Sequence, residues 1–170
     1  GMSLKLVVDA ETDAILGAQG VGEAGVDKRI DVIATAMRGG LTASELTDVE
    51  LSYAPQFGSA KDPVNMLGMI AENLRDGLAE TVQWHEVDAA RQAGVQIVDV
   101  RTPAEFARGG IPGAINVPVD ELRERIEEVS DGAIVHCQVG LRGYIAARIL
   151  AGHGKRVRNL DGGYRTWARV

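Results

Sequence analysis

The sequence predicts an α/β protein in which a parallel sheet with helices on both faces follows a small α+β segment. Two observations support this class. From about residue 81, short β-rich runs alternate with helix-like segments, the order typical of a parallel sheet. Before that point the pattern is a hairpin followed by helices. The change of pattern predicts a boundary at residues 79–82, with one domain over 1–80 and a second over 81–170.

The first domain begins with apolar residues at alternate positions, Leu4, Leu6 and Val8, which predict a strand. A turn at residues 11–13 and a second short apolar run complete the hairpin. The other elements expected here are a helix over 26–40 that ends at two glycines, a capping box from Thr42 to Glu45, a loop from Tyr53 and a helix over 66–80.

The second domain contains short β-rich runs separated by segments with helical character. The strands are expected over residues 96–100, 114–118, 133–137 and 156–160. The helices are expected over residues 86–94, 103–109, 120–129, 142–152 and 163–170. Strands that alternate with helices in this way favour parallel pairing, since a parallel pair needs a crossover connection.

Composition excludes several classes of protein. Hydrophobic residues make up 45% of the 170 residues and charged residues 25%, an ordinary globular balance. No apolar run approaches the length of a membrane helix, and no secretory leader is visible. A single Cys rules out an internal disulfide, and a lone thiol suits a reducing cytoplasm. Residues 1–80 hold 13 acidic and 6 basic side chains, so neither nucleic acid nor a membrane is an expected partner, and no metal is expected.

Residues 20–25 match the G-x-G-x-x-G pattern of dinucleotide-binding loops. Such a loop needs a second parallel strand after its helix, with an acidic residue near the strand's end. Here the helix runs into the polar segment 39–52, and the preceding strand is the return arm of a hairpin. We therefore interpret the glycines as positions where a tight chain reversal packs against a helix, with no nucleotide bound.

The only cysteine, Cys137, ends an apolar run, and Arg142 stands near the start of a predicted helix. We refer to residues 137–142 as the Cys137 loop. At the carboxyl end of a parallel strand, such a loop curls around a hollow where backbone N–H groups and a helix start favour an anion. Gly140 and Gly143 relax the steric limits, and Arg142 adds a permanent charge. Such settings favour the reactive thiolate, although the spacing alone also fits a buried structural cysteine.

Three segments occur in order: "IVDVRTPAEFARGGIPGAINVP", "CQVGLRG" and "LDGGYRTW". Together they resemble a rhodanese domain, the sulfurtransferase fold, over residues 82–170. The resemblance implies that Cys137 is the catalytic residue that carries a sulfane sulfur as a persulfide, with Arg142 as its catalytic partner. The substrate would lie against the rest of the loop and its rim: Gln138, Val139, Gly140, Leu141 and Gly143. Related phosphatases have a loop one residue longer than these six, so loop length favours sulfur over phosphate.

Two positions depart from the family pattern. The family often has His where Gly110 stands, which we interpret as a structural difference. It often has Ser or Thr where Gly143 stands, so the rim of the loop lacks a hydroxyl here. Asp99 and Arg101 match the family's Asp-x-Arg, and we interpret them as supporting residues that form an ion pair or brace the loop, with contact to the substrate as the lesser alternative. His136 neighbours Cys137 but should point to the opposite face of its strand, as a packed core histidine.

The first eighty residues resemble the C-terminal dimerisation domain of pyridine nucleotide–disulfide reductases, in the coenzyme A-disulfide reductase and NADH oxidase branch. The segments that support this are "GAQGVGEAGVDKRIDVIATAM" and "YAPQFGSAKDPVNMLGM". The resemblance implies a homodimer contact or a flavoprotein reductase partner, and a loop over residues 53–57 that faces the partner's active site. It also implies that this domain is incomplete, and that FAD, NAD(P)H and coenzyme A are bound only in a full-length relative.

The function expected from this resemblance is sulfur transfer from thiosulfate or a persulfide to a thiol or cyanide. No redox activity is expected without the flavin domains. A second hypothesis is a sulfur-relay or coenzyme A persulfide-binding module that serves a flavoprotein partner with little turnover of its own. A third is a phosphatase or arsenate reductase, which loop length disfavours.

Overall fold

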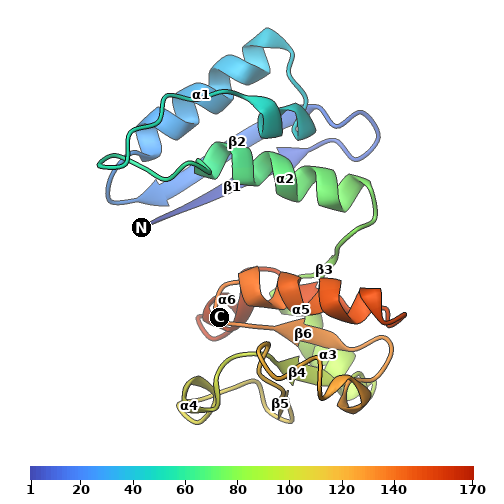
Figure 1. Cartoon of the computed structure of the whole chain (residues 1–170). Coiled ribbons are helices and arrows are strands. Elements are labelled where there is room, and N and C mark those ends of the chain that lie inside the picture. The colour runs from blue at the N-terminus through green and yellow to red at the C-terminus, as the bar shows by residue number, and fades with distance from the viewer. The chain divides into compact units, whose positions relative to one another are not determined.

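The computed structural model describes residues 1–170, which form two compact units, Gly1–Gly77 (unit 1) and Leu78–Val170 (unit 2) (Figure 1). The predicted α/β class is confirmed. Unit 2 holds a five-stranded parallel sheet with helices on its faces, and unit 1 holds a two-stranded antiparallel sheet. None of the helices combines the length and apolarity needed to cross a bilayer.

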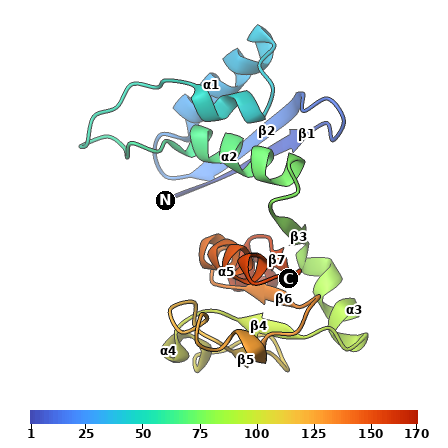
Figure 2. The same ribbon diagram turned by 45° about the vertical axis from the view of Figure 1, so that its right-hand side comes forward.

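Unit 1 is built on the hairpin of β1 (Met2–Val8) and β2 (Ile15–Gly22), which pair antiparallel. Helix α1 (Val26–Gly39) contacts β2 and helix α2 (Pro63–Arg75) contacts β1, as Figure 2 shows. A 3₁₀ turn, Ser44–Asp48, lies between the helices in sequence and packs on α2. The buried core of this unit consists of Ile15, Ile33, Ala36, Ala43, Leu46 and Val64.

The glycines of residues 20–25 have the packing role expected of them. Gly20 lies where a Cβ would overlap the side chains of Val26 and Leu4, so its absence lets β2 approach both α1 and β1. Gly25 adopts the left-handed conformation, with φ 71°, directly before α1. Because β2 pairs only with β1 in a hairpin, the parallel-strand context of a dinucleotide loop does not form.

Helix α2 begins earlier than predicted. The side chain of Asp62 accepts a hydrogen bond from the N–H of Val64 at 3.0 Å, and Pro63 occupies the first helical position. Asp62 is also held by a buried ion pair in which Arg29 Nη2 lies 2.7 Å from Asp62 Oδ2. The predicted capping box also forms, because the Thr42 N–H donates to Glu45 and the Glu45 N–H donates to Thr42 Oγ1.

The strands of unit 2 are arranged in the order β3-β7-β6-β4-β5. Their bounds are Glu80–Val82 (β3), Ile97–Asp99 (β4), Ile115–Asn116 (β5), Ile134–His136 (β6) and Arg158–Leu160 (β7). The helices are α3 (Val87–Gln92), α4 (Pro103–Phe106), α5 (Leu141–Gly152) and α6 (Gly163–Trp167), with 3₁₀ turns at Trp84–Glu86 and Ile126–Glu128. The sequence did not predict β3, a short edge strand with one buried residue, Val82.

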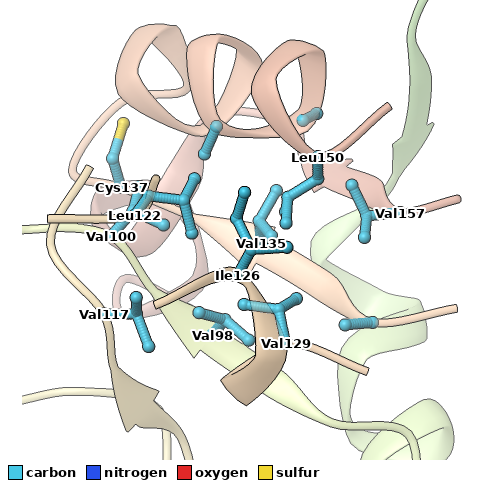
Figure 3. Close-up of a cluster of buried hydrophobic side chains, with 13 residues drawn as sticks. Val98, Val100, Val117, Leu122, Ile126, Val129, Val135, Cys137, Leu150 and Val157 are labelled. Carbon is cyan, nitrogen blue, oxygen red and sulfur yellow. The ribbon is translucent and has the colours of Figure 1, made fainter. Parts of the chain in front are cut away.

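Side chains that alternate along the central strands build two separate cores. Val98 and Val135 belong to the cluster that includes Leu150 of α5, shown in Figure 3. Ile97 and Ile134 belong to a second cluster that includes Val87 of α3. Because neighbouring residues of a strand point to opposite faces, this division covers the sheet on both sides.

The helix predicted over residues 120–129 does not form as an α-helix. The segment consists of turns and the 3₁₀ turn Ile126–Glu128, in which N–H groups donate three residues back. The guanidinium of Arg125 explains part of this geometry, because it binds Glu121 and Glu128 and also donates to the carbonyl of Asn116. Leu122, Ile126 and Val129 are nonetheless buried. The apolar side chains of this segment therefore reach the core from tight turns and not from an α-helix.

Candidate active site

Cys137 follows the last residue of β6, at the carboxyl end of a central strand, and its side chain is 1% exposed. Figure 3 shows its sulfur turned away from the other side chains of the core cluster. The N–H of Gly140 donates to Cys137 Sγ over 3.1 Å. Gly140 has φ 117°, a conformation that only glycine adopts readily, and it directly precedes α5. The Cys137 loop therefore presents a backbone donor and the start of a helix to the sulfur.

Arg142, in the first turn of α5, forms a two-point ion pair with Glu105 of α4. Arg142 Nη1 lies 2.7 Å from Glu105 Oε2, and Nη2 lies 2.8 Å from Oε1. Glu105 raises the pKa of Arg142, and the nearby Cys137 adds to this effect. Sequence reasoning missed Glu105, although Thr102 and Glu105 form a T-x-x-E capping box that marks the start of α4.

Asp99 and Arg101 form a fully buried ion pair, with Arg101 Nη2 2.6 Å from Asp99 Oδ2. The remaining donors of Arg101 reach the surroundings of the loop: Nη1 donates to Gln138 Oε1 at 3.1 Å and Nη2 to the carbonyl of Gly109 at 2.6 Å. The guanidinium also lies 4.2 Å from the centre of the Tyr164 ring. Arg101 thus links the end of β4 to the second residue of the Cys137 loop.

The first residues of α6 hold the other side of the loop. The N–H of Tyr164 donates to the carbonyl of Cys137 at 2.8 Å, and the N–H of Arg165 donates to the carbonyl of Gln138 at 3.0 Å. Gly163 has φ 61°, and a Cβ there would overlap the backbone of residues 137–139. The close approach explains why a glycine pair precedes Tyr164.

The sequence pattern indicates that Gly143 replaces a hydroxyl-bearing residue at the rim, and the structure shows why glycine stands there. A Cβ at Gly143 would overlap Asn159 Oδ1. Asn159 comes from β7 and is 92% buried, its Nδ2 donates to the carbonyl of Gly140 at 3.2 Å, and its Oδ1 has no hydrogen-bond partner. The amide of Asn159 therefore occupies the space beside the loop that a side chain at position 143 would need.

The structure brings most of the predicted site residues to one edge of the sheet. Gly143 and Cys137 are buried, Gln138, Gly140 and Arg142 are partly buried, and Val139 and Leu141 are 47% and 59% exposed. Gly110 packs against the ring of Phe106, where a Cβ would lie 2.9 Å from Cε2. No group of three or more His, Cys, Asp or Glu side chains is arranged to hold a metal ion.

His136 is fully buried and stacks on Tyr164, with ring centres 6.3 Å apart. Its Nδ1 lies 3.4 Å from the carbonyl oxygen of Cys137, and its Nε2 lies 3.7 Å from Asp99 Oδ2. Burial lowers the pKa of His136 below 6.5; Asp99 opposes this shift, whereas Arg101 adds to it. His136 is therefore a neutral core residue, and its ring nitrogens face the Cys137 carbonyl and Asp99 and make no hydrogen bond to Cys137 Sγ, so the two do not form a Cys–His pair.

This burial predicts a pH dependence of stability. As the pH falls below 6.5, the unfolded chain binds a proton at His136 while the folded unit resists it, so the free energy of unfolding should decrease. His136→Leu should weaken this dependence between about pH 6.5 and 5. Urea unfolding followed by tryptophan fluorescence measures it, because Trp84 and Trp167 both lie in unit 2. His153→Leu, at an exposed position, is the control; an unchanged slope in the His136 variant would contradict the prediction.

The site consists of a cysteine at the carboxyl end of a central strand of a parallel α/β unit, in a loop that runs to an arginine in the first turn of a helix. The chain belongs to the rhodanese-like domain family, which residues 83–170 match. Residues 1–63 match a second family, the pyridine nucleotide-disulphide oxidoreductase dimerisation domain. Both family resemblances seen in the sequence are thereby confirmed.

Among solved structures, the chain is similar to reduced CoADR-RHD of Bacillus anthracis, with 50% identity, a TM-score of 0.95, and coverage of 98% of this chain and 30% of that one. It is also similar to a NAD-dependent persulfide reductase from A. fulgidus, with 39% identity, a TM-score of 0.86 and the same coverage. A coenzyme A disulfide reductase of Staphylococcus haemolyticus (strain JCSC1435) is 46% identical over 71 residues, 42% of this chain and 16% of that protein. The chain thus spans less than a third of each relative's length.

Proposed function

We propose that unit 2 is a sulfurtransferase that carries a sulfane sulfur as a persulfide on Cys137. The observation that supports this most directly is the 3.1 Å hydrogen bond from the Gly140 N–H to Cys137 Sγ, at the start of α5. A donor aimed at the sulfur stabilises negative charge there, both on the thiolate and on the persulfide that replaces it. Membership of the rhodanese-like family supports the same chemistry.

The transfer needs two displacement steps. The Cys137 thiolate attacks the outer sulfur of a donor R–S–SH; the new Sγ–S bond forms while the donor S–S bond breaks, and its electron pair leaves on R–S⁻. With thiosulfate as donor, sulfite leaves in the same way. A thiol or cyanide then attacks the outer sulfur of the Cys137 persulfide and releases the Cys137 thiolate. The Gly140 N–H and Arg142 face the charge that moves in both steps.

Intact mass spectrometry after treatment with thiosulfate, or with a low-molecular-weight persulfide, tests this proposal. The wild-type protein should gain the mass of one sulfur atom, and a later addition of cyanide should remove it. Cys137→Ser should show no gain and should reduce sulfur transfer to background, because Cys137 is the only thiol in the chain. Transfer at the wild-type rate by Cys137→Ser would overturn the proposal.

A sulfur relay to a flavoprotein is the second candidate, and the similarity to a protein titled as a persulfide reductase favours it. In this case unit 1 would form a homodimer or bind a reductase partner, and FAD, NAD(P)H and coenzyme A would belong to that larger enzyme. The exposed aromatic side chains of Tyr53 and Phe57, 56% and 82% accessible, suit such a contact. Slow turnover by the isolated chain, with rapid transfer when the reductase is added, would distinguish the relay from an independent enzyme.

A further inference from the structure

The carboxylate of Glu105 is fixed in place beside the Cys137 loop before any substrate arrives. Its Oε2 accepts hydrogen bonds from the N–H and the Oγ1 of Thr102, each at 3.0 Å, which complete the capping box of α4. Both of its oxygens also accept from the two Nη groups of Arg142. Arg142 is the largest influence on Glu105 and lowers the pKa of its carboxyl to about 2, so Glu105 is an anion at neutral pH.

This pairing removes most of the positive charge that the loop would otherwise offer. Arg142 is the only charged residue in the Cys137 loop, and its two terminal nitrogens are engaged by Glu105. The next cation, Arg101, is paired with buried Asp99. The exposed side chain of Arg165, whose N–H binds the loop, makes no ion pair. The sulfur therefore lies near an ion pair with almost no net charge, and it accepts a hydrogen bond from the Gly140 N–H.

The negative charge of the sulfur donor should then affect how fast it reacts with the Cys137 thiolate. Thiolate and thiosulfate together bring three negative charges to the loop, whereas thiolate and a persulfide with an uncharged carbon part bring one when the persulfide is protonated and two when it is ionised. Like charges held a few ångströms apart in a partly buried site repel each other strongly unless a cation compensates them. A loop whose arginine is already neutralised offers little compensation for the larger charge.

We infer that Glu105 is a specificity-determining residue, which makes the Cys137 loop favour donors that release a thiolate over dianionic donors such as thiosulfate. This donor preference rests on the sulfurtransferase function proposed above. Glu105 acts through Arg142 and through its own charge, and it takes no part in bond making. Removal of the negative charge of Glu105 should therefore increase the rate at which anionic donors and reagents react with Cys137.

The test compares Glu105→Gln with Glu121→Gln in the full chain. Both substitutions remove one negative charge from an ion pair with arginine, but the partner of Glu121 is Arg125, which is not part of the Cys137 loop. Iodoacetate and iodoacetamide alkylate Cys137 with similar chemistry and differ in charge, so the ratio of their rates measures the local potential. Glu105→Gln should raise the iodoacetate-to-iodoacetamide ratio about tenfold, and Glu121→Gln should leave it within about twofold.

Sulfur transfer gives the second readout. In Glu105→Gln, kcat/KM for thiosulfate should rise about tenfold relative to kcat/KM for the persulfide of 2-mercaptoethanol, whose carbon part is uncharged. The double variant Glu105→Gln/Arg142→Gln restores the net charge, so its alkylation ratio should return toward that of the wild type. A loss of folding alone would not produce this reversal.

An alkylation ratio in Glu105→Gln equal to that in Glu121→Gln would overturn the inference, whatever the result for sulfur transfer. A raised ratio without sulfur transfer by wild type or variant would instead refute the proposed function and the donor preference with it. The electrostatic effect of Glu105 on Cys137 would still stand in that case. The two failures are therefore distinguishable.

Discussion

Arg101→Met is expected to destabilise unit 2 by about 3–5 kcal/mol, because it leaves the carboxylate of Asp99 buried without its counter-ion. The Asp99 side chain is fully buried and that of Arg101 is 3% exposed. The variant would also lose the hydrogen bonds from Arg101 to Gln138 and Gly109. It should therefore loosen the Cys137 loop as well as lower the stability of the unit.

Urea unfolding measured by tryptophan fluorescence reports this loss for unit 2 alone, since both tryptophans lie there. Arg125→Met is the control, because Arg125 pairs with Glu121 and Glu128 at the surface, where ion pairs add little, so the loss should be smaller even though its bond to the Asn116 carbonyl is removed too. Equal losses in the two variants would show that the buried pair has no special role. In a second measurement, amide exchange of residues 137–140 should accelerate in Arg101→Met and stay unchanged in the control.

Gly143→Ala is expected to cost about 1–3 kcal/mol, because its Cβ would overlap Asn159 Oδ1 in a closely packed interior. An alanine inside a helix normally stabilises it relative to glycine, so the sign of the effect identifies the clash. The variant should also lose sulfur transfer, since movement of Asn159 would release the carbonyl of Gly140, the residue whose N–H binds the sulfur.

Gly152→Ala provides the control in the same helix, because nothing lies within 4 Å of a Cβ at that position. It should leave stability unchanged or raise it by up to about 1 kcal/mol. The double variant Gly143→Ala/Asn159→Ala should regain part of the stability lost in Gly143→Ala, as expected for two residues in contact. A Gly143→Ala protein as stable as wild type would refute the close contact with Asn159.

Much of the fold followed from local patterns. Apolar runs at residues 96–100, 133–137 and 156–160 contain β4, β6 and β7, and the segment at 142–152 is α5. Such patterns work because a strand or an amphipathic helix must bury its apolar side chains. The segment 120–129 shows the limit, since its apolar spacing fits an α-helix but its backbone closes into tighter turns around Arg125. Strand β3 is short and mostly polar, so no apolar pattern in the sequence predicts it.

The sequence by itself determined the Cys137 loop, because its cysteine, glycine and arginine are neighbours in the chain and a strand followed by a helix sets their spacing. The order of the strands and the partners of the loop were decided only by the tertiary structure. Glu105 lies 37 positions from Arg142, and Asn159 lies 19 from Gly140. They meet because the carboxyl ends of parallel strands converge at one edge of the sheet. Contacts of this kind arise from chain crossovers, which leave no local pattern in the sequence.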